Sequence, residues 1–102
     1  MRWFKKKKIS RECWNLNYSF ILWLKDRLPI YVKEASRTVD LEYHKFNYNG
    51  EEYTQLQLIN RMIKLIDYLT QDEKYFDWDQ EVDDKTEQLV EIFKLIFPSL
   101  WW

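Results

Sequence analysis

The sequence predicts an all-α fold, a small bundle of three to four helices in a single domain of residues 1–102. Glycine and proline are scarce: Gly50, Pro29 and Pro98 are the only ones in the chain, and sandwiches and barrels need many more such turns. Apolar residues also recur at the three- and four-residue spacing of helices over long stretches. A chain of this length buries enough surface for one modest core.

The first helix is expected from about Arg11 to Asp26, after a short basic arm at residues 1–9. Ser10 is a suitable N-cap residue, and Pro29 should end the helix because the residue before a proline disfavours the α region. The apolar side combines residues at helical spacing with neighbours that widen it: Cys13, Trp14, Leu16, Tyr18, Phe20, Ile21, Leu22, Trp23 and Leu24. We expect Cys13 to be an ordinary buried core cysteine.

Residues 30–48 allow two interpretations. Pro29 suits the first turn of a second helix, whose apolar side is Val32, Ala35, Val39, Tyr43 and Phe46. The alternative is an α+β fold, in which the Asn49-Gly50 turn joins a hairpin of Val39–Tyr48 with Glu51–Leu58. The helix is preferred because the pattern after Gly50 is helical and Gly50 can itself end a helix.

Two further helices complete the bundle. The apolar side of the third is Tyr53, Leu56, Ile59, Met62, Ile63, Ile66 and Leu69, and its polar stripe is Gln57, Asn60, Arg61, Lys64 and Asp67. An acidic, aromatic loop with a short helical turn is expected at residues 70–83. Asp84 and Glu87 then have the spacing of a capping box, and the fourth helix runs to Phe97 before Pro98 ends it. Its inward side is Leu89, Ile92, Phe93, Ile96 and Phe97.

Charge is distributed unevenly, although the net charge is −1. Residues 1–33 carry nine Lys/Arg and two acidic residues. Residues 34–69 carry four Lys/Arg and six acidic residues, and residues 70–102 carry three Lys/Arg and nine acidic residues. The chain is therefore basic in its first third and acidic in its last.

The longest apolar run, Tyr18–Leu24, is far shorter than the roughly 20 residues that span a bilayer. No signal-peptide pattern follows the basic start, and one cysteine allows no internal disulfide. A cytoplasmic protein is expected.

No set of residues predicts catalysis, a cofactor or a metal site. His44 is the only histidine, and a His-based metal site or catalytic triad needs further groups around it. The acids between Asp77 and Asp83 do not fit an EF-hand loop, because Val82 stands where glycine is required and Gln88 where the bidentate glutamate belongs. We therefore expect a protein that is not an enzyme, with His44 as a surface or capping histidine.

Six Trp, seven Tyr and six Phe are more than so small an interior readily hides, so some should form a binding site. The predicted partner-binding residues are Tyr75, Phe76, Asp77, Trp78, Asp79, Glu81, Asp83, Asp84, Trp101 and Trp102. Their rings anchor the contact, and the acids steer it toward a protein with a basic surface. Trp101 and Trp102 either anchor in the partner or, as preferred, fold back as a lid. A homodimer is a further prediction, because the fourth helix is apolar around much of its girth.

The basic arm suggests a different function. Its candidate residues are Arg2, Trp3, Phe4, Lys5, Lys6, Lys7 and Lys8. Lysines neutralise phosphates while Trp3 and Phe4 stack on bases, and the same composition suits an anionic membrane surface. Nucleic acid and membrane are therefore the alternative partners. Pairing of the arm with the acidic residues 70–84 and a solvated chain end are the other interpretations.

Three features resemble small uncharacterised proteins of tailed bacteriophages over roughly residues 1–97. They are the basic, Trp-bearing start, the Pro29-led middle and the segment Tyr53-Thr-Gln-Leu-Gln-Leu-Ile-Asn-Arg-Met62. The long acidic segment 70–84 departs from that pattern. The resemblance implies no activity, but it implies a bacterial host cell as the setting. We expect a non-enzymatic protein-binding module, a phage-encoded inhibitor that occludes a host or anti-phage defence protein.

Overall fold

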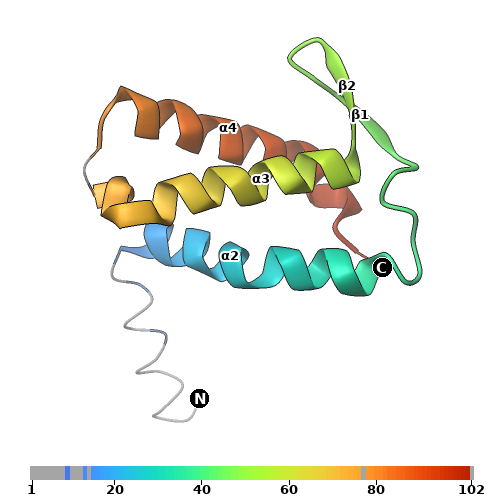
Figure 1. Ribbon diagram of the computed structural model, residues 1–102, viewed down its shortest axis with the longest axis horizontal. Helices are drawn as coiled ribbons and strands as arrows, with labels where there is room; N and C mark the ends of the chain where they lie inside the picture. The colour runs from blue at the N-terminus through green and yellow to red at the C-terminus, as the bar shows by residue number, and fades with distance from the viewer. Residues whose placement is uncertain (1–8, 10–12, 14, 77, 102) are drawn as a thin grey trace.

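Three helices and one hairpin make up the described part of the computed structural model, namely residues 9, 13, 15–76 and 78–101, with the backbone alone at residues 73–75. With the labels of Figure 1, the elements are α2 (Leu16–Ala35), β1 (Lys45–Tyr48), β2 (Glu51–Thr54), α3 (Gln55–Thr70) and α4 (Gln80–Ile96). Two 3₁₀ turns are Gln71–Phe76, in the loop where a helical turn is expected, and Phe97–Ser99. The fold is mostly helical with a hairpin, so the α+β alternative describes it better than a pure all-α bundle.

The central helix is α3, and α2 and α4 pack against it from either side (Figure 1). Its buried apolar residues are Leu58, Ile59, Met62, Leu65, Ile66 and Leu69. The predicted polar stripe is exposed at Gln57, Asn60, Arg61, Lys64 and Asp67. Burying one large aliphatic side chain contributes about 1.5–3 kcal/mol, so α3 and the residues packed on it form the core.

The helix α2 continues through Pro29, so the prediction of one helix ending near Asp26 and another starting at Pro29 is wrong. An interior proline costs about 3 kcal/mol because it removes a helical hydrogen bond. Burial on both sides of the proline offsets this cost, since the buried stripe is Ile21, Leu24, Leu28 and Ala35. Four residues of the predicted apolar side of this helix lie outside that stripe and are exposed: Leu16, Phe20, Leu22 and Trp23.

A loop and a short hairpin follow α2 in place of the second helix expected up to Phe46. Asn49 and Gly50, at the turn, have φ angles of 52° and 82°. Both central residues need positive φ in a type I′ turn, which matches the twist of the two flanking strands. The turn chemistry at Asn49-Gly50 therefore overrides the helical spacing of the apolar residues before it.

The hairpin is shorter than the alternative predicted from the sequence, with four residues in each strand. β2 ends at Thr54 because this residue caps α3. Its hydroxyl accepts a hydrogen bond from the Gln57 N–H (3.1 Å), and the Gln57 side chain accepts one from the Thr54 N–H (2.8 Å), which makes a capping box. On β1, the hydroxyl of buried Tyr48 donates to Glu91 of α4 (3.3 Å) and links the hairpin to that helix.

The helix α4 begins one turn earlier than predicted. Its N-cap is Asp79, whose carboxylate accepts a hydrogen bond from the Val82 N–H (2.9 Å). The capping box predicted at Asp84 and Glu87 is wrong, since both residues lie inside the helix. Val82 is 1% exposed, so the earlier start buries an apolar residue that a later start would leave in the loop. The helix dipole also favours the acids of the first turn, Glu81 and Asp83.

We expect Thr54→Ala to lower the free energy of unfolding by about 1 kcal/mol, because an N–H group at the start of α3 loses its side-chain acceptor. Thr54→Ser keeps the hydroxyl and should retain most of the stability. Urea unfolding followed by far-UV circular dichroism measures both variants. Equal stability of Thr54→Ala and wild type would show that the capping box contributes nothing.

Candidate functional site

The predicted partner-binding residues lie in two separate places. Phe76 and Trp78 precede α4 and are 55% and 50% exposed, whereas Trp101 follows α4 and is 64% exposed. The 17 residues of α4 place about 25 Å between its two ends. Asp77, Trp102 and the side chain of Tyr75 lie outside what the structure describes. The predicted set therefore does not form one contact surface.

The acids at the start of α4 take part in the local structure of the helix. Asp79 is the N-cap, and the side-chain amide of Gln80 donates to Asp84 (2.8 Å). Burial, together with a hydrogen bond to Glu81, raises the pKa of Tyr68 to about 12. Because acids are stabilising at a helix N-terminus, these roles account for much of the acidic cluster without a binding partner.

A different set of aromatic side chains forms a continuous surface. The rings of Trp23 and Phe20 on α2 stack nearly parallel, with centroids 6.2 Å apart and 8° between the planes. Phe20 also lies edge-on to Phe93 of α4 (5.7 Å, 76°), and Phe93 contacts Phe97 (5.3 Å, 62°). The four rings thus run from one outer helix to the other. We call these rings, together with Leu16 one turn before Phe20, the aromatic surface.

The aromatic surface is open to solvent. Phe20 and Trp23 are 44% and 48% exposed, and Leu16 and Phe97 are both 61% exposed. Single exposed apolar residues are common on folded proteins, whereas contiguous ones mark interaction sites. The residues follow one another at intervals of three or four along each helix, which is the spacing used to contact a further helix.

A hollow of about 540 Å³ lies along α2 beside these rings. Within the described part of the chain its lining is Leu16, Ser19, Phe20, Leu22, Trp23, Asp26 and Arg27. The Arg27 guanidinium lies 4.4 Å from the centroid of the Trp23 ring, which is a cation–π contact. On α2, the aromatic surface therefore ends at two neighbouring charges of opposite sign, Asp26 and Arg27.

The sequence contains a signal for the aromatic surface. The apolar arc predicted for the first helix is wider than one interface needs, because one stripe at Ile21, Leu24 and Leu28 already fills the core. The second stripe, which includes Phe20 and Trp23, remains outside. Phe97, predicted to face inward on α4, is exposed in the same way. An apolar arc too wide for one neighbour indicates a second contact.

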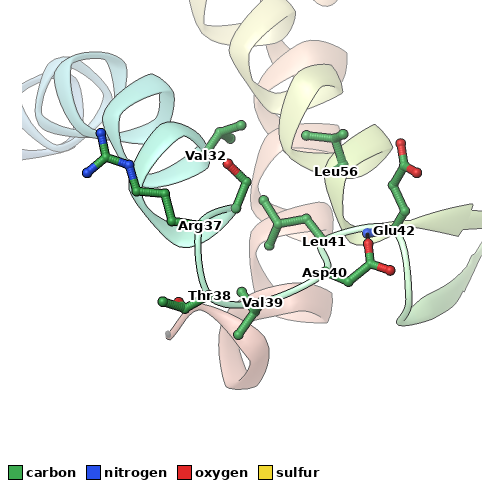
Figure 2. A pocket seen from close by; sticks show the side chains of 9 residues that line it. Val32, Arg37, Thr38, Val39, Asp40, Leu41, Glu42 and Leu56 are labelled. Atoms are coloured by element: carbon green, nitrogen blue, oxygen red, sulfur yellow. Dashed lines mark hydrogen bonds between the residues drawn. The ribbon is translucent and has the colours of Figure 1, made fainter.

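The loop after α2 borders two other hollows. The larger, about 590 Å³, lies between the end of α2, this loop and Leu56 of α3 (Figure 2). Its lining includes the apolar residues Val32, Val39, Leu41 and Leu56 and the charged residues Arg37, Asp40 and Glu42. Because the charges are of both signs, the larger hollow favours no single class of ligand. The smaller, about 210 Å³, lies between the loop and the residues after α4, Ser99 and Trp101.

Trp101 borders the smaller hollow, with its backbone held and its ring exposed. The Tyr31 hydroxyl donates to the carbonyl of Trp101 (2.9 Å), and the side-chain amide of Gln55 donates to the carbonyl of Ser99 (3.1 Å). The ring nevertheless remains 64% exposed, so the prediction of a lid is wrong for Trp101. The backbone bonds hold the segment in place and leave the ring available for contact.

Cys13 and His44 do not form a catalytic pair. Cys13 precedes α2 and His44 follows it, and this helix of 20 residues is about 30 Å long. Cys13 is exposed, so the prediction of a buried core cysteine is wrong, whereas His44 lies at the surface as predicted. No group of three or more potential metal ligands occurs among the residues that the structure describes.

The basic arm, Arg2 to Lys8, lies outside the described residues, so binding of nucleic acid or membrane through it stays a prediction. In the portion of the chain that is described, no helix is both long and apolar enough to cross a membrane. Comparisons with known protein families, curated proteins and solved structures found no match. The resemblance to phage proteins stays a prediction too.

Glu87 lies on a ridge of like charge along α4. Glu91, one turn further along the helix, raises the pKa of Glu87, with smaller contributions from burial and from Asp83 and Asp84. Because the folded-state pKa lies above the unfolded one, the folded protein binds more protons between the two values. Stability at this site is therefore highest at low pH and falls as pH rises through the folded-state pKa.

We expect Glu87→Gln to raise Tm slightly at pH 7, because the neutral amide removes the repulsion from Glu91. The gain should shrink as pH falls toward about 4, the ordinary pKa range of glutamate. Scanning calorimetry at several pH values measures both effects, with Glu52→Gln on β2 as a control outside the ridge. A lower Tm for Glu87→Gln at pH 7 would contradict the expectation.

Proposed function

We propose that this chain is a non-enzymatic protein-binding module whose contact region is the aromatic surface on α2 and α4. The observation that carries the proposal is the run of ring contacts from Trp23 through Phe20 and Phe93 to Phe97. Three of these rings keep about half of their surface in water. A partner that covers them would gain the energy of their burial.

Aromatic side chains are suited to this role. They are enriched among the residues that dominate binding energy at interfaces, because each buries a large area with few rotatable bonds. The rings of the aromatic surface already contact one another, so a partner does not have to order each of them separately, which lowers the entropy cost of binding. Their helical spacing on α2 and α4 is compatible with a partner helix that lies along these two helices.

Occlusion is the mechanism that suits such a surface. A module that covers the functional surface of its target inhibits it without a reacting group of its own. A phage-encoded inhibitor of a host or anti-phage defence protein, expected from the sequence resemblance, would act in this way. Asp26 and Arg27 at the edge of the aromatic surface allow charged contacts of either sign with the target.

The acidic, aromatic end before α4 is a second candidate contact region. Phe76 and Trp78 are as exposed there as the rings of the aromatic surface, and the neighbouring acids attract basic proteins. Phe76 packs on Tyr18 of α2 (4.7 Å between centroids), and Asp79 caps α4. Some side chains of this region therefore already have partners within the fold, so the aromatic surface is the preferred contact region.

Two matched double variants test the proposal. Phe20→Ser/Trp23→Ser removes two rings from the aromatic surface, and Phe76→Ser/Trp78→Ser removes two rings of similar exposure from the other candidate region. Each chain also carries a photo-crosslinking residue at position 16 and is expressed in bacteria. We expect wild type to crosslink one host protein and Phe20→Ser/Trp23→Ser to reduce that product at least about tenfold, because two dominant side chains are lost. Phe76→Ser/Trp78→Ser should retain it.

Circular dichroism must first show that both variants keep the wild-type fold. Loss of the crosslink in Phe76→Ser/Trp78→Ser alone would move the contact to the acidic end. If the wild-type chain crosslinks no protein from position 16, the aromatic surface is not a protein-binding region.

A further inference from the structure

The smaller hollow is built from three parts of the chain: the loop after α2, the first residue of α3 and the residues after α4. Its described lining is Val39, Asp40, Tyr43, His44, Gln55, Ser99 and Trp101. Pockets for drug-sized ligands measure about 300–1,000 Å³. At about 210 Å³, this hollow suits a single side chain better than a cofactor.

Beside side chains that can donate as well as accept, this pocket holds two acceptor groups that keep spare capacity within the described chain. One oxygen of the Asp40 carboxylate accepts from the Glu42 N–H (2.9 Å), and the other accepts no hydrogen bond from the described part of the chain. Gln55 is 3% exposed, and its amide nitrogen donates to the Ser99 carbonyl (3.1 Å) and the Tyr31 hydroxyl (3.4 Å). The Gln55 carbonyl oxygen accepts no hydrogen bond within the described residues. These acceptors favour a ligand that donates.

Three aromatic rings complete the lining. Tyr43 and His44 meet edge to face, with centroids 5.3 Å apart and 83° between the planes. Tyr43 is 74% exposed and Trp101 is 64% exposed, so much of each ring is accessible. The faces of aromatic rings attract cations, and tryptophan does so most strongly. No Lys or Arg is found among the described residues that line the pocket.

We propose that this pocket binds a cationic side chain, an arginine of a protein partner. A guanidinium group carries five N–H donors and no acceptor, stacks on aromatic faces and pairs with carboxylates, so it complements the Asp40 carboxylate, the Gln55 carbonyl oxygen and the rings. An anion would meet the Asp40 carboxylate. A calcium or magnesium ion would need several oxygen ligands, whereas this pocket offers one carboxylate beside three rings. The inference rests on the proposed function in one respect, that the cation belongs to a protein.

A peptide titration followed by NMR tests the pocket on the full chain. The probe is Ac-Gly-Arg-Gly-NH₂, and the control is the same peptide with citrulline, which has nearly the same shape and no charge. We expect the arginine peptide to shift the resonances of Tyr43, His44 and the Trp101 indole in a saturable way, and to bind at least about fivefold more tightly than the citrulline peptide.

Two variants remove one element each. Asp40→Asn keeps an oxygen for the Glu42 N–H and loses the charge, and Trp101→Ala loses the ring. Each should weaken arginine-peptide binding about two- to fivefold, as expected for exposed ion pairs and cation–π contacts. The matched controls Asp83→Asn and Trp78→Ala remove an exposed carboxylate and an exposed ring at the other end of α4. These controls should bind as wild type does.

Equal shifts with the arginine and citrulline peptides, shifts away from the pocket, or wild-type affinity in both Asp40→Asn and Trp101→Ala would overturn the inference. The double variant Phe20→Ser/Trp23→Ser should bind the arginine peptide normally. This variant separates the two proposals. Loss of arginine-peptide binding with a persistent crosslink at the aromatic surface would overturn only the pocket, and peptide binding without a crosslink would overturn only the aromatic surface.

Discussion

The burial of α3 on two sides is the constraint on which the rest of the structure depends. Leu58, Ile59, Met62 and Leu69 are 0% exposed, and a helix with so wide an apolar arc needs more than one neighbour. α2 and α4 each pack on α3, and these two outer helices contact each other where Phe20 touches Phe93. No other helix of the described chain covers the apolar residues that remain on the two outer helices.

The fold could be predicted from the sequence where the pattern is local and strong. The polar stripe of α3, from Gln57 to Asp67, is exposed as predicted, because the regular spacing of the apolar residues fixes which side of the helix faces the core. The passage of α2 through Pro29 could not be predicted, since packing on both sides of the proline opposes a local preference. The start of α4 at Asp79 depends in the same way on tertiary packing, because it buries Val82, and the sequence around Val82 does not by itself indicate that burial.

The candidate sites could be predicted only in part. Exposure of Phe76, Trp78 and Trp101 is in line with the excess of aromatic residues, and α4 separates the first two from Trp101. The exposure of Phe20 and Trp23 does not follow from helical spacing alone, because α2 has two apolar stripes and only one of them faces the core. The pocket at Asp40, Gln55 and Trp101 joins segments far apart in the sequence, so no spacing rule reveals it.

The hydrogen bonds from Tyr31 and Gln55 hold the segment after α4 against the end of α2 and the start of α3. A chain cut after Pro98 would leave the Gln55 amide, 3% exposed, without the Ser99 carbonyl that it bonds, and an unsatisfied buried donor is costly. The same cut would remove Leu100, which packs against the core. Truncation here would therefore remove contacts that hold the C-terminal end of α2 and the N-terminal end of α3. Fragments used to map binding must retain residues 99–101.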